Sequence, residues 1–174
     1  MTEPRRAGSR RRLVVRGVLV AVVAALFLLV SGILPVQAIR VPTDSMSPTV
    51  TAGDHLLLDK RDRTAHVGDV VVLDDPQGGG PIVKRVVAVG GDQIGFEDGI
   101  LVRNGQPVAE PYSDTFLDGV YYGPYDIPTG QIWVLGDNRY DSIDSRDFGP
   151  VDASAVLGHV DLRLLPLPGR LGPS

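Results

Sequence analysis

The chemistry open to this chain is set by the nucleophiles and bases that it contains. It has no cysteine, which excludes disulfides, thiol catalysis and cysteine-ligated metal sites. Its histidines are scattered without the spacing of a zinc site and are more typical of surface or satisfied side chains: His55, His66 and His159. A serine hydroxyl needs a base to become a good nucleophile. Ser45 with Lys84 is the economical pair, a known variant of the serine–histidine arrangement.

Ser45 lies in a short segment that two prolines should stiffen. Residues 42–49 read Pro-Thr-Asp-Ser-Met-Ser-Pro-Thr and follow the only long apolar run of the chain. Because proline fixes φ and removes a backbone donor, we expect this segment to be extended or turned rather than helical. It could hold the hydroxyls of Thr43 and Ser45 in place, or it could be a Pro/Ser/Thr-rich spacer.

Lys84 lies within an apolar strand pattern, residues 82–89, and shares one face of it with three apolar side chains. If this face turns inward, burial disfavours the charged ammonium and lowers the lysine pKa from about 10.4. A lysine with a pKa of roughly 7–8 can act as a general base at neutral pH. The alternative is an edge-strand lysine that prevents aggregation, and it stays open because Arg85 has an equally apolar face.

A third element, unusually polar, follows the apolar run that contains Trp133. Residues 136–146 read Gly-Asp-Asn-Arg-Tyr-Asp-Ser-Ile-Asp-Ser-Arg. If this loop is solvated, its Asp–Arg pairs contribute only about 0–1 kcal/mol. It could instead form a rigid polar network in which Ser142 hydrogen-bonds the base and orients it. Asp144 and Arg146 would point to the same side of an extended segment, so they need bridging geometry or another partner.

The elements that must position these residues are short strands. Apolar, β-branched runs between glycines and prolines predict a mainly β fold from residue 40 onward. The expected strands cover residues 54–58, 70–73, 82–89, 99–103, 131–135 and 158–165. Residues 74–81 and the pair Asn104-Gly105 are typical of hairpin turns. Residues 110–130 show no clear period and are expected to be irregular, in the core or as a surface lid, carrying Tyr112, Tyr121, Tyr122 and Tyr125.

The amino terminus has the composition of a membrane anchor. Residues 1–16 carry a net charge of +5 and the whole chain −4, which leaves −9 for the remainder and disfavours nucleic-acid binding. Residues 17–39 are uncharged and mostly apolar, long enough for a helix to cross a bilayer core of about 30 Å. The arginines should keep residues 1–16 in the cytoplasm and residues 40–174 outside it, in a single-pass plasma-membrane protein.

A cleaved signal peptide is the competing interpretation of the same segment. Residues 9–14 loosely resemble a twin-arginine signal, and Val36-Gln37-Ala38 could form a cleavage site. The apolar run is longer than the usual signal-peptide core of about 7–15 residues. Cleavage after Ala38 would also leave Ser45 only a few residues from a loose new end, so we favour a retained anchor.

Taken together, these elements resemble the bacterial type I signal peptidases, membrane-anchored Ser-Lys endopeptidases (family S26) that remove signal peptides from precursors. The resemblance rests on residues 42–49, 68–72, 83–92 and 136–146, in this order. It implies a mainly β catalytic core of two antiparallel sheets at residues 40–174, behind one transmembrane helix. The family's small inserted second domain would be reduced to residues 93–130, and neither a cofactor nor a metal is expected.

The resemblance also implies roles for single residues. Ser45 would be the nucleophile and Lys84 the general base, acting through an acyl-enzyme. Thr43, at a position where many members have serine, would join the backbone N–H of Ser45 in the oxyanion hole, whose donors are often worth about 2.7–4 kcal/mol each. The supporting residues would be Ser142, in contact with the lysine, the ion pair of Asp144 and Arg146, and Asp137 and Asn138.

Two other functions fit part of the pattern. A Ser-Lys autoprotease repressor shares the Ser-Met and the later lysine, but it should be cytosolic with a DNA-binding segment, which the anchor at residues 17–39 argues against. A membrane-tethered binding module without catalysis is the non-enzyme alternative. The resemblance to the type I signal peptidases is the interpretation we favour, and it implies precursors with small residues, typically alanine, one and three positions before the cut. Apolar strand residues and Met46 are candidates for the walls of the two pockets.

Overall fold

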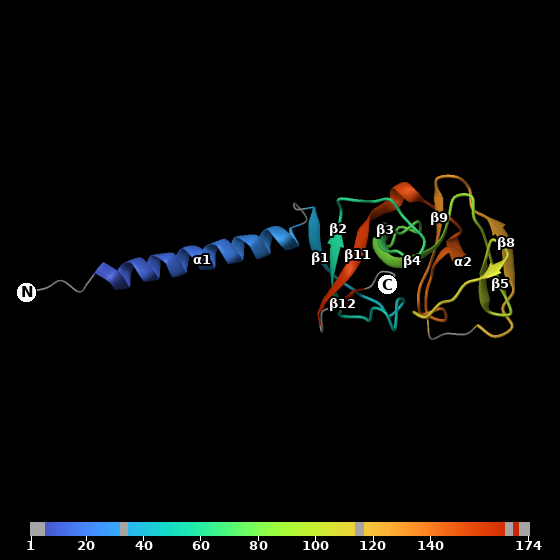
Figure 1. Cartoon of the computed structure of the whole chain (residues 1–174), viewed down its shortest axis with the longest axis horizontal. Helices are drawn as coiled ribbons and strands as arrows, with labels where there is room; N and C mark the ends of the chain where they lie inside the picture. The colour runs from blue at the N-terminus through green and yellow to red at the C-terminus, as the bar shows by residue number, and fades with distance from the viewer. Residues whose placement is uncertain (1–5, 32–34, 114–116, 166–168, 171–174) are drawn as a thin grey trace, which may run out of the picture.

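The structure has one long helix followed by a β-rich domain of two antiparallel sheets (Figure 1). The computed structural model describes residues 6–31, 35–113, 117–165, 169 and 170. The predicted mainly β fold with two antiparallel sheets is confirmed.

Helix α1 (Arg6–Val30) extends away from the β domain and approaches it at strand β1 (Figure 1). Its large apolar side chains between Leu13 and Leu28 are exposed. Among the described residues, no helix combines the length and the apolar character that crossing a membrane requires.

The boundary expected at Ile39 for the amino-terminal helix is wrong, because strand β1 (Val36–Arg40) occupies the end of that range. Pro35 directly precedes this strand, and proline does not continue a helix because it lacks the N–H and clashes with the preceding turn. The three residues considered as a cleavage site lie within β1, each opposite a residue of β2 (His55–Asp59).

The first sheet, sheet A, has the strand order β1-β2-β11-β3-β4-β9-β10, with β12 beside β11. Its other strands are β3 (Val70–Asp74), β4 (Pro81–Val89), β9 (Gln131–Leu135), β10 (Val151–Asp152), β11 (Val156–Leu165) and β12 (Gly169–Arg170). Five of the six predicted strands lie here, and the predicted hairpin across residues 74–81 joins β3 to β4. Two short helices, α2 (Ser145–Phe148) and η1 (Ala153–Ala155), flank β10.

The second sheet, sheet B, has the order β7-β6-β5-β8 and comes entirely from residues 93–130, the range expected as a reduced insert. Its strands are β5 (Gln93–Glu97), β6 (Ile100–Arg103), β7 (Gln106–Pro107) and β8 (Tyr122–Asp126). The predicted hairpin turn at Asn104 and Gly105 is confirmed, with φ of 53° and 71° between β6 and β7. The expectation that residues 110–130 are irregular is wrong at β8, whose Tyr-Gly-Pro-Tyr-Asp sequence hides a strand behind turn residues.

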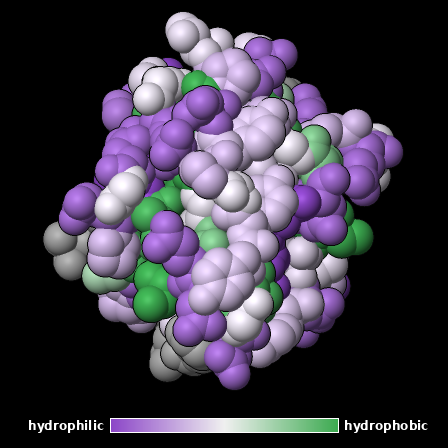
Figure 2. Space-filling view, turned by 90° about the vertical axis from the view of Figure 1, so that its right-hand side faces the viewer, coloured by the Kyte–Doolittle hydropathy of each residue, from purple (hydrophilic) through white to green (hydrophobic). Residues whose placement is uncertain are grey.

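Sheet B packs against sheet A around Trp133, which is fully buried. The ring centroid of Trp133 lies 5.8 Å from that of Tyr122 and 5.2 Å from that of Tyr125. The opposite face of sheet B looks outward at the end of the molecule far from α1, where hydrophobic residues form small patches among hydrophilic ones (Figure 2). The insert therefore completes the hydrophobic core and is an integral part of the domain.

A second buried cluster lies beneath the segment that carries Ser45. Met46 and Val50 are almost fully buried there, against Leu56 of β2 and Val70 of β3. Fully burying a side chain of this size is typically worth about 1.5–3 kcal/mol. Met46 thus anchors the segment to sheet A.

Candidate active site

Ser45 is held in a closed turn between β1 and β2. The backbone N–H of Val41 donates to the carbonyl of Asp54 at 2.9 Å, and that of Gly53 donates back to Val41 at 2.9 Å. Within the turn, the N–H of Val50 donates to the carbonyl of Met46 at 2.9 Å. The segment is non-helical, as its prolines predict, and it is fixed at both ends and in the middle.

Lys84 of β4 reaches Ser45 directly. Its Nζ lies 2.9 Å from Oγ of Ser45, and the lysine is only 4% exposed. Burial lowers the pKa of Lys84 from its ordinary value of 10.5, while the nearby Asp144 carboxylate acts in the opposite direction. The edge-strand alternative for Lys84 is therefore wrong, because β4 is flanked by β3 and β9.

The hydroxyl of Thr43 lies on the exposed side of this pair. Its Oγ1 donates to Oγ of Ser45 at 3.3 Å, and the side chain is open to solvent. The two hydroxyls and the amine therefore form one short chain, with Ser45 in the middle.

The start of the polar loop after β9 contacts the backbone of Ser45. The N–H of Asn138 donates to the carbonyl of Ser45 at 3.1 Å, and its Nδ2 donates to the carbonyl of Asp44 at 3.3 Å. Gly136 has no room for a side chain, since a Cβ there would lie 2.2 Å from Oγ of Ser142 and 2.4 Å from the carbonyl oxygen of Ser45. The polar loop and the nucleophile turn are thus in direct backbone contact.

The structure does not form the hydrogen bond expected between Ser142 and Lys84. Oγ of Ser142 is buried and has no hydrogen-bond partner within the described part of the chain. It lies instead over Gly136, which packs directly against the carbonyl of Ser45. Spacing along a loop predicts which residues gather, but it does not fix the rotamer of one hydroxyl.

Asp144 and Arg146 form a bidentate ion pair. Nε and Nη2 of Arg146 each lie 2.9 Å from an oxygen of Asp144, which is fully buried and also accepts the N–H of Gly136 at 3.0 Å. Although burial alone would raise it, these partners hold the pKa of Asp144 below its ordinary value. The pair needs no third partner because α2 begins at Ser145, with Asp144 as its N-cap, and the chain turns instead of extending.

Asp137 has a partner that sequence reasoning missed. Its two carboxylate oxygens accept Nε and Nη2 of Arg85 at 2.8 and 2.7 Å, and both residues are buried. Oγ1 of Thr49 donates to the same carboxylate at 2.6 Å, which ties it to the nucleophile turn. The sequence did carry a signal for such a partner, because Arg85 shares its strand face with apolar side chains. A buried arginine requires a hydrogen-bond acceptor.

Comparison with known proteins decides the family. The model of the family described as signal peptidase, peptidase S26, matches residues 12–165. The probable signal peptidase I-1 of Synechocystis sp. is 36% identical over 147 residues, 76% of this chain and 74% of that protein. The signal peptidase I of Bacillus licheniformis is 33% identical over 173 residues, 91% of each chain. Signal peptidase I V of Bacillus subtilis is 35% identical over 131 residues, 66% of this chain and 77% of that one.

This chain belongs to the signal peptidase I family. The family assigns it to the peptidases and supports the removal of signal peptides from precursor proteins as its activity. Within the described residues, no group of three or more His, Asp and Glu side chains could hold a metal ion.

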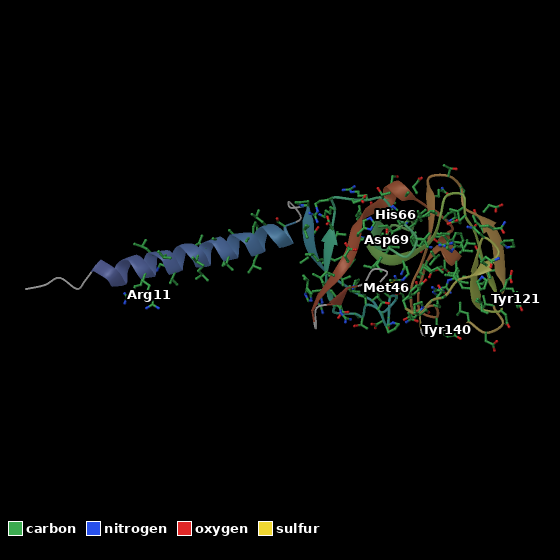
Figure 3. The ribbon with its side chains drawn as sticks, in the orientation of Figure 1. Arg11, Met46, His66, Asp69, Tyr121 and Tyr140 are labelled. Carbon is green, nitrogen blue, oxygen red and sulfur yellow. The ribbon has the colours of Figure 1, made fainter. Side chains whose placement is uncertain are left out.

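A groove in the surface of the β domain is lined by residues of β1, β2, β3, β4 and β11. It has a volume of about 400 Å³ and begins at Pro42 and Val83, which lie close to Ser45 and Lys84 in sequence. Its apolar lining includes Ile39, Leu58, Val72 and Leu157. Its basic lining residues are Arg40, Lys60 and Arg63. In Figure 3, Met46, the neighbour of Ser45, lies between β1 on the side of α1 and Tyr140 of the polar loop.

Proposed function

We propose that this chain removes amino-terminal signal peptides from secreted precursors, with Ser45 as nucleophile and Lys84 as general base. The observation that carries the proposal is the 2.9 Å contact between Nζ of a buried lysine and Oγ of Ser45. A desolvated amine is neutral over more of the pH range, so it can accept the hydroxyl proton. No cofactor, metal or nucleic acid takes part.

The reaction would proceed through an acyl-enzyme. Lys84 takes the proton of Ser45 as Oγ attacks the scissile carbonyl, which forms a tetrahedral intermediate with a negative oxygen. The intermediate collapses as the ammonium of Lys84 gives its proton to the leaving amine, the new amino terminus of the mature protein. Lys84 then takes a proton from water, whose oxygen attacks the ester carbonyl, and the second collapse returns a proton to Ser45.

The oxyanion would rest on the N–H of Ser45 and on the hydroxyl of Thr43. In the free protein this hydroxyl donates to Oγ of Ser45 at 3.3 Å. A rotation about χ1 would redirect it toward an oxyanion on the adjacent carbon, where one donor is worth about 2.7–4 kcal/mol. Its exposed position leaves space for the substrate.

The remaining predicted site residues would support the pair. We assign Asn138 to holding the backbone of Ser45, and Asp137 to fixing Arg85 and Thr49. Asp144 with Arg146 would set the start of α2 and the N–H of Gly136. Ser142 would act by contact, through its packing over Gly136.

The residues before the cut would lie in the groove that begins at Pro42 and Val83. Its apolar residues suit small uncharged side chains such as alanine, and two of its residues, Pro42 and Val83, are close to Ser45 and Lys84 in sequence. The wall residue Val83 alternates with Lys84 along β4, so one strand would supply both the base and part of the pocket.

We further propose that α1 anchors the enzyme in the plasma membrane, with the amino terminus in the cytoplasm and the β domain outside. The supporting observations are the uncharged run that starts at Gly17, the exposed apolar side chains of α1 and the arginines before them. The lipid bilayer would then be a partner, and the catalytic pair would stand near its surface. Protease treatment of intact spheroplasts tests this orientation: digestion of the amino-terminal tail rather than the β domain would refute it.

The catalytic assignment is tested by cleavage of a secretory precursor with purified full chain. We expect Ser45→Ala and Lys84→Ala to abolish cleavage. Lys84→Arg should do the same, because arginine keeps the charge but cannot act as a base. Ser154→Ala is the matched serine control, since that residue is exposed in η1 and should leave the rate unchanged. Activity that survives Ser45→Ala or Lys84→Ala would refute the mechanism.

A further inference from the structure

Residues 110–113 connect sheet B to the polar network behind the nucleophile. Both carboxylate oxygens of Glu110 accept hydrogen bonds from the guanidinium of Arg139, at 2.9 and 2.5 Å. The ring of Tyr112 lies over the guanidinium of Arg85, 4.0 Å from its Cζ. Oγ of Ser113 donates to the backbone carbonyl of Asp137 at 2.9 Å. Three side chains of this short segment thus contact the same network.

The charges that these residues cover are buried. Arg85 and Arg139 are each 3% exposed, and Asp137 is fully buried. Asp137 neutralises Arg85 from one side, and the aromatic face of Tyr112 covers the guanidinium, which is a favourable cation–π position. Glu110 supplies the carboxylate that Arg139 requires. Removing Tyr112 would uncover the guanidinium of Arg85, and removing Glu110 would leave the buried Arg139 without its carboxylate.

Tyr112 and Glu110 also support each other. The hydroxyl of Tyr112 donates to Oε1 of Glu110 at 3.1 Å. Burial raises the pKa of Tyr112 to about 12, so the phenol stays protonated and remains a donor at physiological pH. Glu110 and Tyr112 are therefore bonded to each other as well as to the arginines of the network.

The network continues from these residues to Ser45. Asp137, which pairs with Arg85, accepts the hydroxyl of Thr49 at 2.6 Å in the nucleophile turn. Asn138, the next residue, donates its N–H to the carbonyl of Ser45 at 3.1 Å. Arg139 donates to the carbonyl of Gly136 at 2.9 Å. Gly136 is in turn packed against the carbonyl of Ser45. The residues that segment 110–113 contacts are therefore linked, directly or through one further residue, to the turn that carries Ser45.

We propose that residues 110–113 form a strap that positions Ser45 for catalysis, with Glu110 and Tyr112 as positioning residues that act through Arg139, Arg85 and Asp137. The inference rests on the proposed function, because it assumes that Ser45 is the nucleophile. Neither residue touches the substrate or the reacting atoms. Their effect should therefore fall on kcat, since a displacement of about 1 Å at a reacting group can cost on the order of 10²-fold in rate.

The decisive measurement compares Tyr112→Leu, Tyr112→Phe and Tyr121→Leu for precursor cleavage. Tyr112→Leu should lower kcat by about 10- to 100-fold and leave KM within about twofold. Tyr112→Phe should restore kcat to within about threefold, because the ring still covers Arg85 and only the bond to Glu110 is lost. Tyr121 lies in the same stretch but is 71% exposed, so Tyr121→Leu is the matched control and should match the parent.

A second variant covers the case in which Tyr112→Leu does not fold. Glu110→Gln keeps the shape of the side chain and weakens its charge-assisted bonds to Arg139, so kcat should fall while thermal unfolding shows a folded protein. The strap is refuted if folded Tyr112→Leu or Glu110→Gln retains the parent kcat, if the loss falls on KM alone, or if Phe fails to rescue. Cleavage by Ser45→Ala would instead overturn the assignment of the nucleophile, so the two failures are distinguishable.

Discussion

Gly136→Ala should slow catalysis, because the added side chain would displace the backbone of Ser45. The added Cβ would lie 2.2 Å from Oγ of Ser142 and 2.4 Å from the carbonyl oxygen of Ser45, where ordinary contact begins at 3.4 Å. The backbone of Ser45 would therefore have to move by about 1 Å, against a turn that is anchored by buried Met46 and Val50.

A displacement of this size should lower kcat by on the order of 10²-fold, which corresponds to about 2.7 kcal/mol of transition-state stabilisation. The fold should lose about 1–3 kcal/mol, the usual range for overpacking. The assay is single-turnover cleavage of a signal-peptide-bearing precursor by the full chain. A parallel thermal melt shows whether the variant is folded at the assay temperature.

Gly99→Ala is the matched control for this prediction. A Cβ at Gly99 would lie equally close, 2.2 Å, to the carbonyl of Leu117, and its φ of +78° adds backbone strain. This residue lies in the turn between β5 and β6 of sheet B, so it should destabilise the protein at least as much and leave kcat unchanged. A Gly136→Ala enzyme with kcat within about threefold of the parent, or equal losses in both variants, would refute the reasoning.

Three further predictions concern charge and turn geometry. Asp137→Asn should cost about 3–5 kcal/mol in the free energy of unfolding, because Arg85 keeps its buried charge without a counter-ion; a melt within 1 °C of the parent would contradict this. The pKa of Asp144 is lowered on folding, so its ionisation stabilises the fold above pH 3.8 and this stability is lost as the pH falls through the folded value. Asp144→Asn should therefore melt earlier at pH 7 and depend less on pH in the acid range, which thermal melts between pH 2 and 7 would show. Gly105→Ala, at a φ of +71° with open space around its Cβ, should cost about 1 kcal/mol and leave cleavage unchanged.

The sequence predicted the parts of this molecule whose signals are local. Alternation and turn residues predicted β4 and the turn at Asn104, because each follows from a period of two or from a required positive φ. The contact of Ser45 with Lys84 was inferred from chemistry, since a serine nucleophile without histidine needs another base. That inference used residue types and the local strand pattern around Lys84, and it needed no knowledge of the path of the chain.

The features that sequence reasoning missed depend on the third dimension. The pairing of Arg85 with Asp137 joins residues 52 positions apart, and although the strand pattern indicates that Arg85 is buried, it does not identify the acceptor. Strand β8 was missed because its glycine and proline read as turn residues, yet an edge position beside β5 tolerates both. The rotamer of Ser142 depends on packing against Gly136, which is visible only when the loop is folded.

The two neighbouring cations of β4 explain how one strand serves both structure and chemistry. Lys84 and Arg85 point to opposite sides and are buried to almost the same extent, 4% and 3% exposed. A guanidinium cannot lose its charge, so burial of Arg85 requires the bidentate carboxylate of Asp137, and that pair in turn fixes the loop that touches Ser45. A lysine can lose its proton, so burial of Lys84 beside a hydroxyl instead lowers its pKa and favours the neutral base. Exchanging the two residues would remove both effects, because the arginine would then lie beside Ser45 as a permanent charge and the lysine would replace a two-point contact with one.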